Sequence, residues 1–159
     1  MSFPTLSQSN IKLTEEQIHE DVAYYQNKIR NIATCSEHEV PLMLKIFIEG
    51  IAKIGNMQST ILLSFNQAKK KRKEAEAIAV LEKYPEWCQS KKKKGTVVEG
   101  QSFTDLDAEV QSARENEHYY EALNMYLQNA RQTLVYAHDD LKKITYTNMS
   151  SGNQKMYPS

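Results

Sequence analysis

The sequence predicts an all-α protein built around an elongated antiparallel helical hairpin, with a shorter helix on its N-terminal side. Prolines, which break the interior of helices, are few. They occupy positions 4, 41, 85 and 158 and leave two long windows without proline, 42–84 and 86–157. In both windows apolar residues recur at intervals of three and four, the pattern of a helix with one buried face. Helices that bury one stripe each pack as a bundle or a coiled coil.

The length of the chain, 159 residues, is that of one domain. We expect a single helical domain over residues 14–145, with a loop at about 85–103. Residues 1–13 include Pro4 and several Ser and Asn residues, and they are expected to form a flexible arm. Residues 146–159 are mostly small and polar, so we expect a disordered tail there.

The first predicted helix covers about residues 14–33. Thr14 is followed three residues later by Gln17, which matches a capping box at a helix N-terminus. A coiled-coil-like stripe follows, with spacings of four and three residues. Its members are Ile18, Val22, Tyr25, Ile29 and Ile32.

The second predicted helix covers about residues 40–84. Pro41 suits a first helical turn, where its missing N–H is not needed, and Pro85 is expected to end the helix. Gly50 and Gly55 either weaken the helix or let a neighbouring helix approach closely. The apolar stripe consists of Leu44, Ile48, Ile51, Gly55, Leu62, Phe65, Ala68, Ala75, Ile78 and Ala79.

The third predicted helix follows the loop, in which residues 96–98 (Thr-Val-Val) suggest a short extended piece. Thr104 is the expected N-cap, with carboxylates after it that favour the N-terminal end of the helix dipole. The helix is expected to reach about residue 144. Its apolar stripe alternates strictly between spacings of three and four and consists of Tyr120, Leu123, Leu127, Ala130, Leu134, Ala137, Leu141 and Ile144.

Further apolar residues lie off these stripes, and three helices of this arrangement cannot cover them all. The residues concerned are Met43, Phe47, Met57, Leu63, Met125, Tyr126 and Val135. We therefore expect the chain to associate into a homo-oligomer.

The composition excludes several classes of protein. Twenty basic residues balance twenty acidic ones, so no overall positive charge indicates a nucleic-acid-binding protein. Two cysteines, Cys35 and Cys88, are too few for a disulfide framework and fit a reducing compartment. The N-terminal residues do not form a signal peptide, and no stretch is apolar enough to span a bilayer. The sequence predicts a soluble, cytoplasmic protein without membrane contact.

The charges are nevertheless segregated along the chain. Residues 69–94 contain ten basic residues against four acidic ones, whereas residues 99–121 contain seven acidic residues and only Arg114 as a base. An antiparallel hairpin lays the second segment beside the first. The basic run at 69–73 is therefore either paired with the acidic segment or free to bind an anion.

The predicted loop contains a second group of lysines, which has no acidic segment predicted beside it. Lys91, Lys92, Lys93 and Lys94 are adjacent, and four like charges repel one another unless an anion joins them. Trp87 and Tyr84 lie just before them. Lysines beside aromatic rings are typical of single-stranded nucleic-acid binding, because lysines neutralise phosphates and rings stack on unpaired bases. The alternative is that Trp87 closes the end of the hairpin core while the lysines are merely solvated.

Catalytic and metal chemistry have little support in the sequence. Glu16 with His19, and Glu115 with His118, have the spacing of di-iron helical bundles, but the further inward-facing glutamates of such sites are missing. Cys35 has His38 three residues away but no convincing third partner, and Cys88 has no base or oxyanion-type glycine motif nearby. No glycine-rich phosphate loop occurs in the sequence. We expect no enzyme activity, no metal and no cofactor.

One known family has a similar arrangement. Four segments follow one another: a long helix that is first apolar and then basic, a loop with basic and aromatic residues, an acidic helix start, and a final Tyr- and Leu-rich helix ending YAHDDLKKI. This order resembles the UvsY-type phage recombination mediators over about residues 44–145. The end of the family's long helix is only approximated by residues 81–84, Leu-Glu-Lys-Tyr. The lysine-rich loop, the first helix and the polar tail have no counterpart in the family.

The resemblance implies a non-enzymatic accessory protein that binds single-stranded DNA. It would help to load a RecA-like recombinase onto strands coated with a single-strand-binding protein, in the host cytoplasm. The resemblance places DNA contact on Lys69, Lys70, Lys71, Arg72, Lys73, Lys83 and Tyr84. It places oligomerisation on Tyr120, Leu123, Leu127, Leu134, Leu141 and Ile144. The alternative function is a coiled-coil structural, assembly or inhibitor protein that acts through protein contacts alone.

Overall fold

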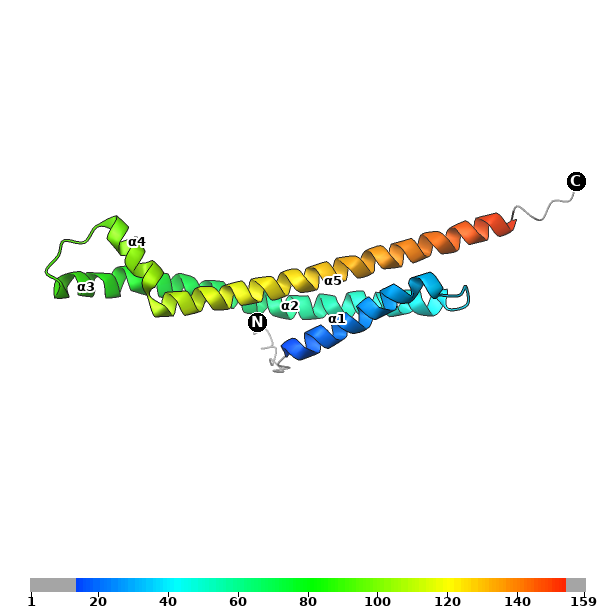
Figure 1. The fold of residues 1–159 in the computed structure, drawn as a ribbon, viewed down its shortest axis with the longest axis horizontal. Helices are drawn as coiled ribbons and strands as arrows, with labels where there is room; N and C mark the ends of the chain where they lie inside the picture. The colour runs from blue at the N-terminus through cyan, green and yellow to red at the C-terminus, as the bar shows by residue number, and fades with distance from the viewer. Residues whose placement is uncertain (1–13, 154–159) are drawn as a thin grey trace, which may run out of the picture. The chain divides into compact units, whose positions relative to one another are not determined.

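The structure is a computed structural model that describes residues 14–153. It confirms the all-α class and the long helical hairpin, and the described residues contain no strand (Figure 1). The predicted arm at 1–13 lies outside the described residues, as does the end of the predicted tail at 154–159. None of the helices that the structure describes has the length and apolar character needed to cross a bilayer.

The helices follow one another with short connections. In chain order they are α1 (Glu15–Arg30), a 3-10 turn (Asn31–Thr34), α2 (Val40–Ile78), a π turn (Ala79–Lys83), α3 (Tyr84–Ser90), α4 (Val97–Leu106) and α5 (Ala108–Asn153). Their contacts divide the chain into two compact units. The first unit contains the residues up to Gly50 and those from Leu134 onward, and the second contains Ile51–Thr133.

In the first unit, α1 packs beside the start of α2. The predicted capping box is present: the Gln17 backbone N–H donates to the Thr14 hydroxyl, and the Thr14 N–H donates to the Gln17 side chain, both at 3.2 Å. The core is formed by Ile18, Val22, Tyr25, Val40, Phe47, Leu134, Ala137 and Leu141. A Cβ atom on Gly50 would lie 2.7 Å from the Tyr25 ring. Gly50 therefore allows the close approach of α1 to α2.

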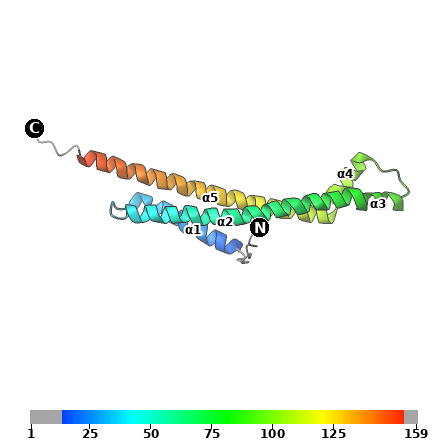
Figure 2. The same cartoon turned by 180° about the vertical axis from the view of Figure 1, so that it is seen from behind.

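In the second unit, α2 and α5 run antiparallel, as two opposite views agree (Figures 1 and 2). Gly55 lies near Arg131, whereas Arg72, further along α2, contacts Glu117, earlier in α5. The core of this pair consists of Ile54, Met57, Ile61 and Ala68 from α2 with Val110, Leu123, Leu127 and Ala130 from α5. The predicted stripe of the last helix is thus buried over most of its length, although Tyr120 is half-buried and Ile144 is exposed.

Pro85 does not end the second helix, which corrects the prediction. The helical path continues through the π turn into α3, where Pro85 occupies the first turn. The Tyr84 N–H donates to the Ala79 carbonyl, so the register of hydrogen bonds is reset just before the proline. A proline in a first turn has no hydrogen bond to lose, and the helix therefore tolerates it.

The helix ends instead at a Schellman motif formed by the lysines. The Lys92 N–H donates to the Gln89 carbonyl and the Lys93 N–H donates to the Cys88 carbonyl, both at 3.1 Å. Lys92 has a φ of 52°, the left-handed conformation that this motif requires. The lysine run is therefore held by backbone hydrogen bonds at the end of α3.

The predicted loop at 85–103 was wrong over most of its length, because residues 91–96 alone connect α3 to α4. Thr96 is the N-cap of α4, and its hydroxyl accepts from the Glu99 N–H at 3.2 Å. The expected extended piece at 96–98 is thus the start of a helix. β-branched valines at 97 and 98 favour strands, but a capped first turn with tertiary contacts overrides that preference.

The start and end of the last helix also differ from the prediction. Thr104 is buried inside α4, where its hydroxyl donates to the Gly100 carbonyl at 2.9 Å. The N-cap of α5 is Asp107, whose carboxylate accepts from the N–H groups of Glu109 and Val110 at 3.0 and 3.1 Å. At its other end α5 continues to Asn153, beyond the predicted end at about 144. The start of the predicted disordered tail is therefore helical.

Candidate functional site

The basic run at 69–73 lies on α2, opposite the acidic start of α5. Arg72 contacts Glu117 on α5 through Nε, and it contacts Glu76 on its own helix at 2.7 Å. Lys70 lies 3.6 Å from Glu74, and the Lys69 ammonium lies 5.9 Å from the Phe65 ring centroid. Lys71 and Lys73 have no ion pair with any described residue. The run is therefore partly neutralised by its neighbours.

Lys83 is paired more completely. Its ammonium donates to Asp107 at 2.9 Å and to Glu109 at 2.7 Å, which joins the π turn to the start of α5. The hydrogen bond from Lys83 lowers the pKa of Asp107, and the hydrogen bonds to Glu109 and Asp107 raise the pKa of Lys83. Because the Lys83 ammonium is already paired with two carboxylates, it is not free to bind a phosphate.

Arg114 completes this network from the α5 side. Its guanidinium donates to Glu76 at 2.9 Å and to Asp105 on α4 at 2.9 Å. Burial of Glu76 opposes its ionisation, but hydrogen bonds from Arg114 and Arg72 outweigh burial and lower the pKa of Glu76. The question that the sequence left open for the run at 69–73 is thus answered for Arg72, which is paired with the acidic segment. Lys83, outside that run, is paired with the same segment.

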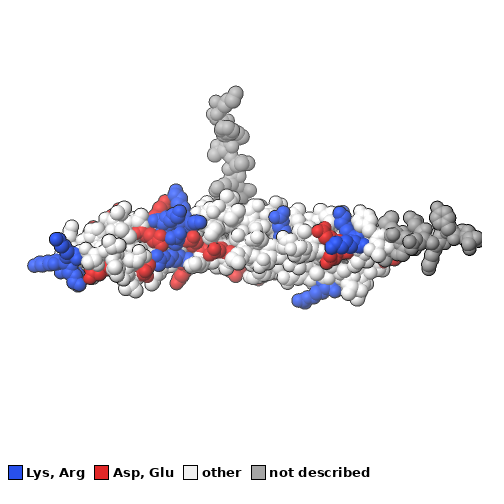
Figure 3. Space-filling view, turned by 90° about the horizontal axis from the view of Figure 1, so that it is seen from above, with Lys and Arg blue, Asp and Glu red and all other residues white. Residues whose placement is uncertain are grey.

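The lysine turn, residues Lys91–Lys94, differs from the upstream run. Lys91, Lys92 and Lys94 are exposed and have no acidic partner among the described residues. Lys93 lies 4.0 Å from Glu99 and 5.9 Å from the centroid of the Trp87 ring. Figure 3 shows a group of basic side chains at the α3 end of the second unit, whereas basic and acidic side chains alternate further along α2 and α5. Among the described residues of this unit, the turn therefore carries three unpaired lysines close together in the chain, in addition to Lys71 and Lys73 on α2.

The aromatic residues beside the turn form a three-ring cluster. The Tyr84 and Trp87 rings are stacked with centroids 6.1 Å apart, and Phe103 of α4 lies 5.7 and 5.8 Å from them. The Tyr84 hydroxyl donates to the Thr96 carbonyl and accepts from the Thr96 N–H, both at 2.9 Å. Tyr84 therefore holds the start of α4 in place. Trp87 is half-buried, so it supports α4 and is still partly open to solvent.

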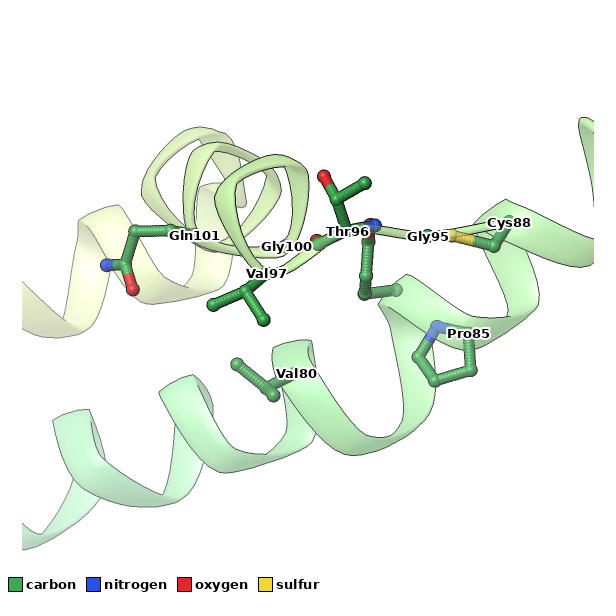
Figure 4. Close-up of a pocket in the computed structure, with 9 residues that line it drawn as sticks. Val80, Pro85, Cys88, Gly95, Thr96, Val97, Gly100 and Gln101 are labelled. Carbon is green, nitrogen blue, oxygen red and sulfur yellow. The ribbon is translucent and has the colours of Figure 1, made fainter. Parts of the chain in front are cut away.

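Two grooves lie beside α4. The first has a volume of about 560 Å³, and Val80 and Val97 face each other across it (Figure 4). The second, which we call the Trp87 groove, has a volume of about 600 Å³. It is lined by Trp87, Val98, Glu99, Ser102, Phe103, Leu106, Asp107 and Ala108.

α4 buries two small residues and exposes three of its apolar ones. Gly100, beside Tyr84 of α3, and Thr104 are buried, whereas Val97, Val98 and Leu106 are 90%, 76% and 77% exposed. A Cβ atom on Gly100 would lie 3.1 Å from the Tyr84 ring, which explains why a glycine occupies this contact. Such an arrangement leaves an apolar surface facing solvent.

Sequence reasoning missed α4, because Glu99 and Phe103 were assigned to a loop and Leu106 to the start of the last helix. A signal was present. Thr96 is followed three residues later by Glu99, the spacing of a capping box, and Gly100 and Thr104 are four residues apart on one helical face.

The histidines and cysteines considered for metal binding or catalysis lie in different places of the structure. The described residues contain no group of three or more His, Cys, Asp or Glu side chains arranged to hold a metal. His19 lies 3.5 Å from Glu15, and His118 lies 3.5 Å from Glu121. Cys88 is buried. The pKa of Cys35 is raised, mainly because its thiol is partly desolvated and secondly because the negative charge of Glu39 is nearby.

The residues assigned to oligomerisation lie mostly inside the single chain. Leu123 and Leu127 are buried in the second unit, and Leu134 and Leu141 are buried in the first. Phe47 and Met57, which we expected to lie uncovered, are also buried. Ile144, Met125 and Leu63 are 49%, 57% and 65% exposed. Self-association stays a prediction.

Comparisons of the chain with protein-family models, with curated proteins and with solved structures found no match.

Proposed function

We propose that this chain is a non-enzymatic accessory protein that binds single-stranded nucleic acid through the lysine turn. One observation carries the proposal: Lys91, Lys92 and Lys94 are exposed and unpaired on a turn fixed by a Schellman motif, beside the only tryptophan of the chain. Cations that are not already paired can neutralise phosphates and release counterions. A partly exposed ring next to them offers an unpaired base an apolar contact.

The ion pairs narrow the proposed interface. Arg72 and Lys83 would have to give up their carboxylates before they could bind phosphate, and that exchange gains little free energy. Tyr84 is engaged with Thr96 and covered by Gly95 and Gly100, so it is not proposed as a stacking residue. Lys71 and Lys73 remain as secondary contacts on α2.

The test compares two triple variants with the same net charge. In the first, Lys91, Lys92 and Lys94 become Glu; in the second, the exposed residues Lys45, Lys142 and Lys143 become Glu. Binding of a labelled oligonucleotide of about 15 bases is followed by fluorescence anisotropy at several salt concentrations. We expect wild-type binding to weaken steeply with salt.

The turn variant should lose most of this affinity and reduce the salt slope by about 2, since each neutralised phosphate contributes about 0.7. The control variant should bind like the wild type. Equal binding by the turn variant and the wild type contradicts the proposed site, and an absence of wild-type binding at low salt contradicts the proposed function.

The more specific role of loading a RecA-like recombinase is proposed on the sequence resemblance alone. It implies contacts with a recombinase and with a single-strand-binding protein. Addition of this chain should then speed the assembly of such a recombinase on coated single strands, and the turn variant should not.

A second candidate function is favoured by the outward apolar face of α4. Val97, Val98 and Leu106 would lose their contact with water if a second copy of this chain covered them. The mass in solution, measured by light scattering, tests this. We expect a mass above that of one chain, and a Val97→Asn, Leu106→Asn variant should shift it towards the monomer.

A further inference from the structure

We infer that the Trp87 groove is a subsite for one unpaired nucleobase and that it prefers cytosine to thymine. The inference rests on the proposed function, since it assigns the base contact that accompanies phosphate capture by the lysine turn. It also adds a selectivity that stacking and electrostatics by themselves do not supply.

The walls of the groove are suited to a flat, apolar ligand. Trp87 and Phe103, whose ring centroids lie 5.8 Å apart, both line it. Val98 and Leu106, both more than three-quarters exposed, line it as well. A volume of about 600 Å³ is within the range of small-molecule sites. A base inserted here would cover apolar surface that now faces solvent.

Lys93 connects this groove to the lysine turn. Its ammonium lies 5.9 Å from the centroid of the Trp87 ring and 4.0 Å from Glu99, and both residues line the groove. Lys92 and Lys94, one on each side of it in the chain, are unpaired. A strand whose phosphates contact these lysines therefore has the groove within reach of its bases.

The polar side-chain groups of the groove are the indole N–H of Trp87, which donates hydrogen bonds, and the oxygens of Asp107, Ser102 and Glu99, which accept them. Asp107 is already engaged by three donors, because one carboxylate oxygen accepts from two backbone N–H groups and the other accepts from Lys83. The Ser102 hydroxyl donates to the Val98 carbonyl and keeps only acceptor capacity. Glu99 has Lys93 as its ion-pair partner at a distance of 4.0 Å. Its carboxylate is therefore the group best able to receive a hydrogen bond from a ligand.

This acceptor distinguishes the pyrimidines. Cytosine presents an amino group that donates to a carboxylate, whereas thymine presents a carbonyl oxygen at the same position. A carboxylate facing that oxygen forms no hydrogen bond and repels it. The groove should consequently favour cytosine.

The experiment uses the full chain with oligo(dC) and oligo(dT) of about 15 bases at low salt. Anisotropy of labelled strands measures affinity, and the emission of Trp87, the sole tryptophan, reports occupancy of the groove. We expect oligo(dC) to bind about fivefold more tightly than oligo(dT) and to change Trp87 emission at lower strand concentration.

The Glu99→Gln variant should bind both strands and lose the preference. Glu86→Gln, which removes an exposed carboxylate of α3 outside the groove, should keep it. Circular dichroism confirms that both variants stay helical.

Equal affinity for the two strands, or Trp87 emission that stays constant on binding, overturns the base subsite and leaves the proposed function standing. A preference that survives Glu99→Gln overturns the assignment of Glu99. Failure of the wild type to bind either strand overturns the proposed function and this inference with it.

Discussion

At the scale of single residues, two glycines of α2 have opposite surroundings although they lie five positions apart in one helix. A Cβ atom on Gly50 would come within 2.7 Å of the Tyr25 ring and 3.0 Å of the Leu134 side chain. A Cβ atom on Gly55 would meet only the flexible side chain of Arg131, at an ordinary 3.4 Å. Gly50 is therefore required by packing, whereas Gly55 is not.

This difference predicts opposite effects of the same substitution. Gly50→Ala should lower the free energy of unfolding by about 1–3 kcal/mol, because the buried ring must move. Gly55→Ala should raise it by up to about 1 kcal/mol through better helix propensity. Urea unfolding followed by circular dichroism measures both. Equal effects of the two substitutions would show that Gly50 does not set the approach of α1.

At the scale of elements, the region between α2 and α5 shows how capping decides helix boundaries. α3 ends where Lys92 takes the left-handed conformation, α4 begins where the Thr96 hydroxyl caps it, and α5 begins at Asp107. Pro85, by contrast, lies within a helical path. Backbone hydrogen bonds to specific side chains, rather than the positions of prolines, define these elements.

Asp107 has two separable roles in this region, which substitutions can distinguish. Asp107→Ala removes both the cap of α5 and the ion pair with Lys83, and it should cost about 1–2 kcal/mol of stability. Asp107→Asn keeps a capping oxygen and loses the charge, so it should cost clearly less. Thermal unfolding of the two variants measures the difference. Equal losses would mean that the ion pair, and not the cap, is the main contribution.

At the scale of the whole molecule, a chain with equal numbers of acids and bases keeps its charges apart along the sequence. Part of this separation is cancelled in the fold, where Arg72, Lys83 and Arg114 bind the carboxylates of facing helices. Lys91, Lys92 and Lys94 of the lysine turn are outside this network, as are Lys71 and Lys73 of α2. The positive charge available to a ligand is therefore local, although the molecule as a whole is neutral.

The network also predicts how stability depends on pH. Asp107 and Glu76 have lowered pKa values in the folded chain, so they contribute stability above their unfolded pKa values, which are about 3.9 and 4.3. This contribution is lost as the pH falls through the folded pKa values. Urea unfolding between about pH 6 and pH 3 should show a decline on acidification. Glu76→Gln should make the decline shallower, and an unchanged slope would contradict the contribution of Glu76.

The sequence by itself determined the helical class, the position of α1 with its capping box, and most of the apolar stripe of α5. These features rest on local periodicity and on contacts between residues three or four apart, which a single chain displays directly. It also pointed to Lys91–Lys94 beside Trp87 as a distinctive cluster.

Only the tertiary structure decided the rest. Whether Arg72 and Lys83 are free depends on acids more than twenty residues away, and α4 depends on rings and glycines that meet in space. The same contacts turned Tyr84 into a support for α4 and placed Phe103 and Glu99 beside Trp87. Interactions between distant residues leave no periodic trace in a sequence. For this reason the Trp87 groove could not be predicted, although the lysines next to it could.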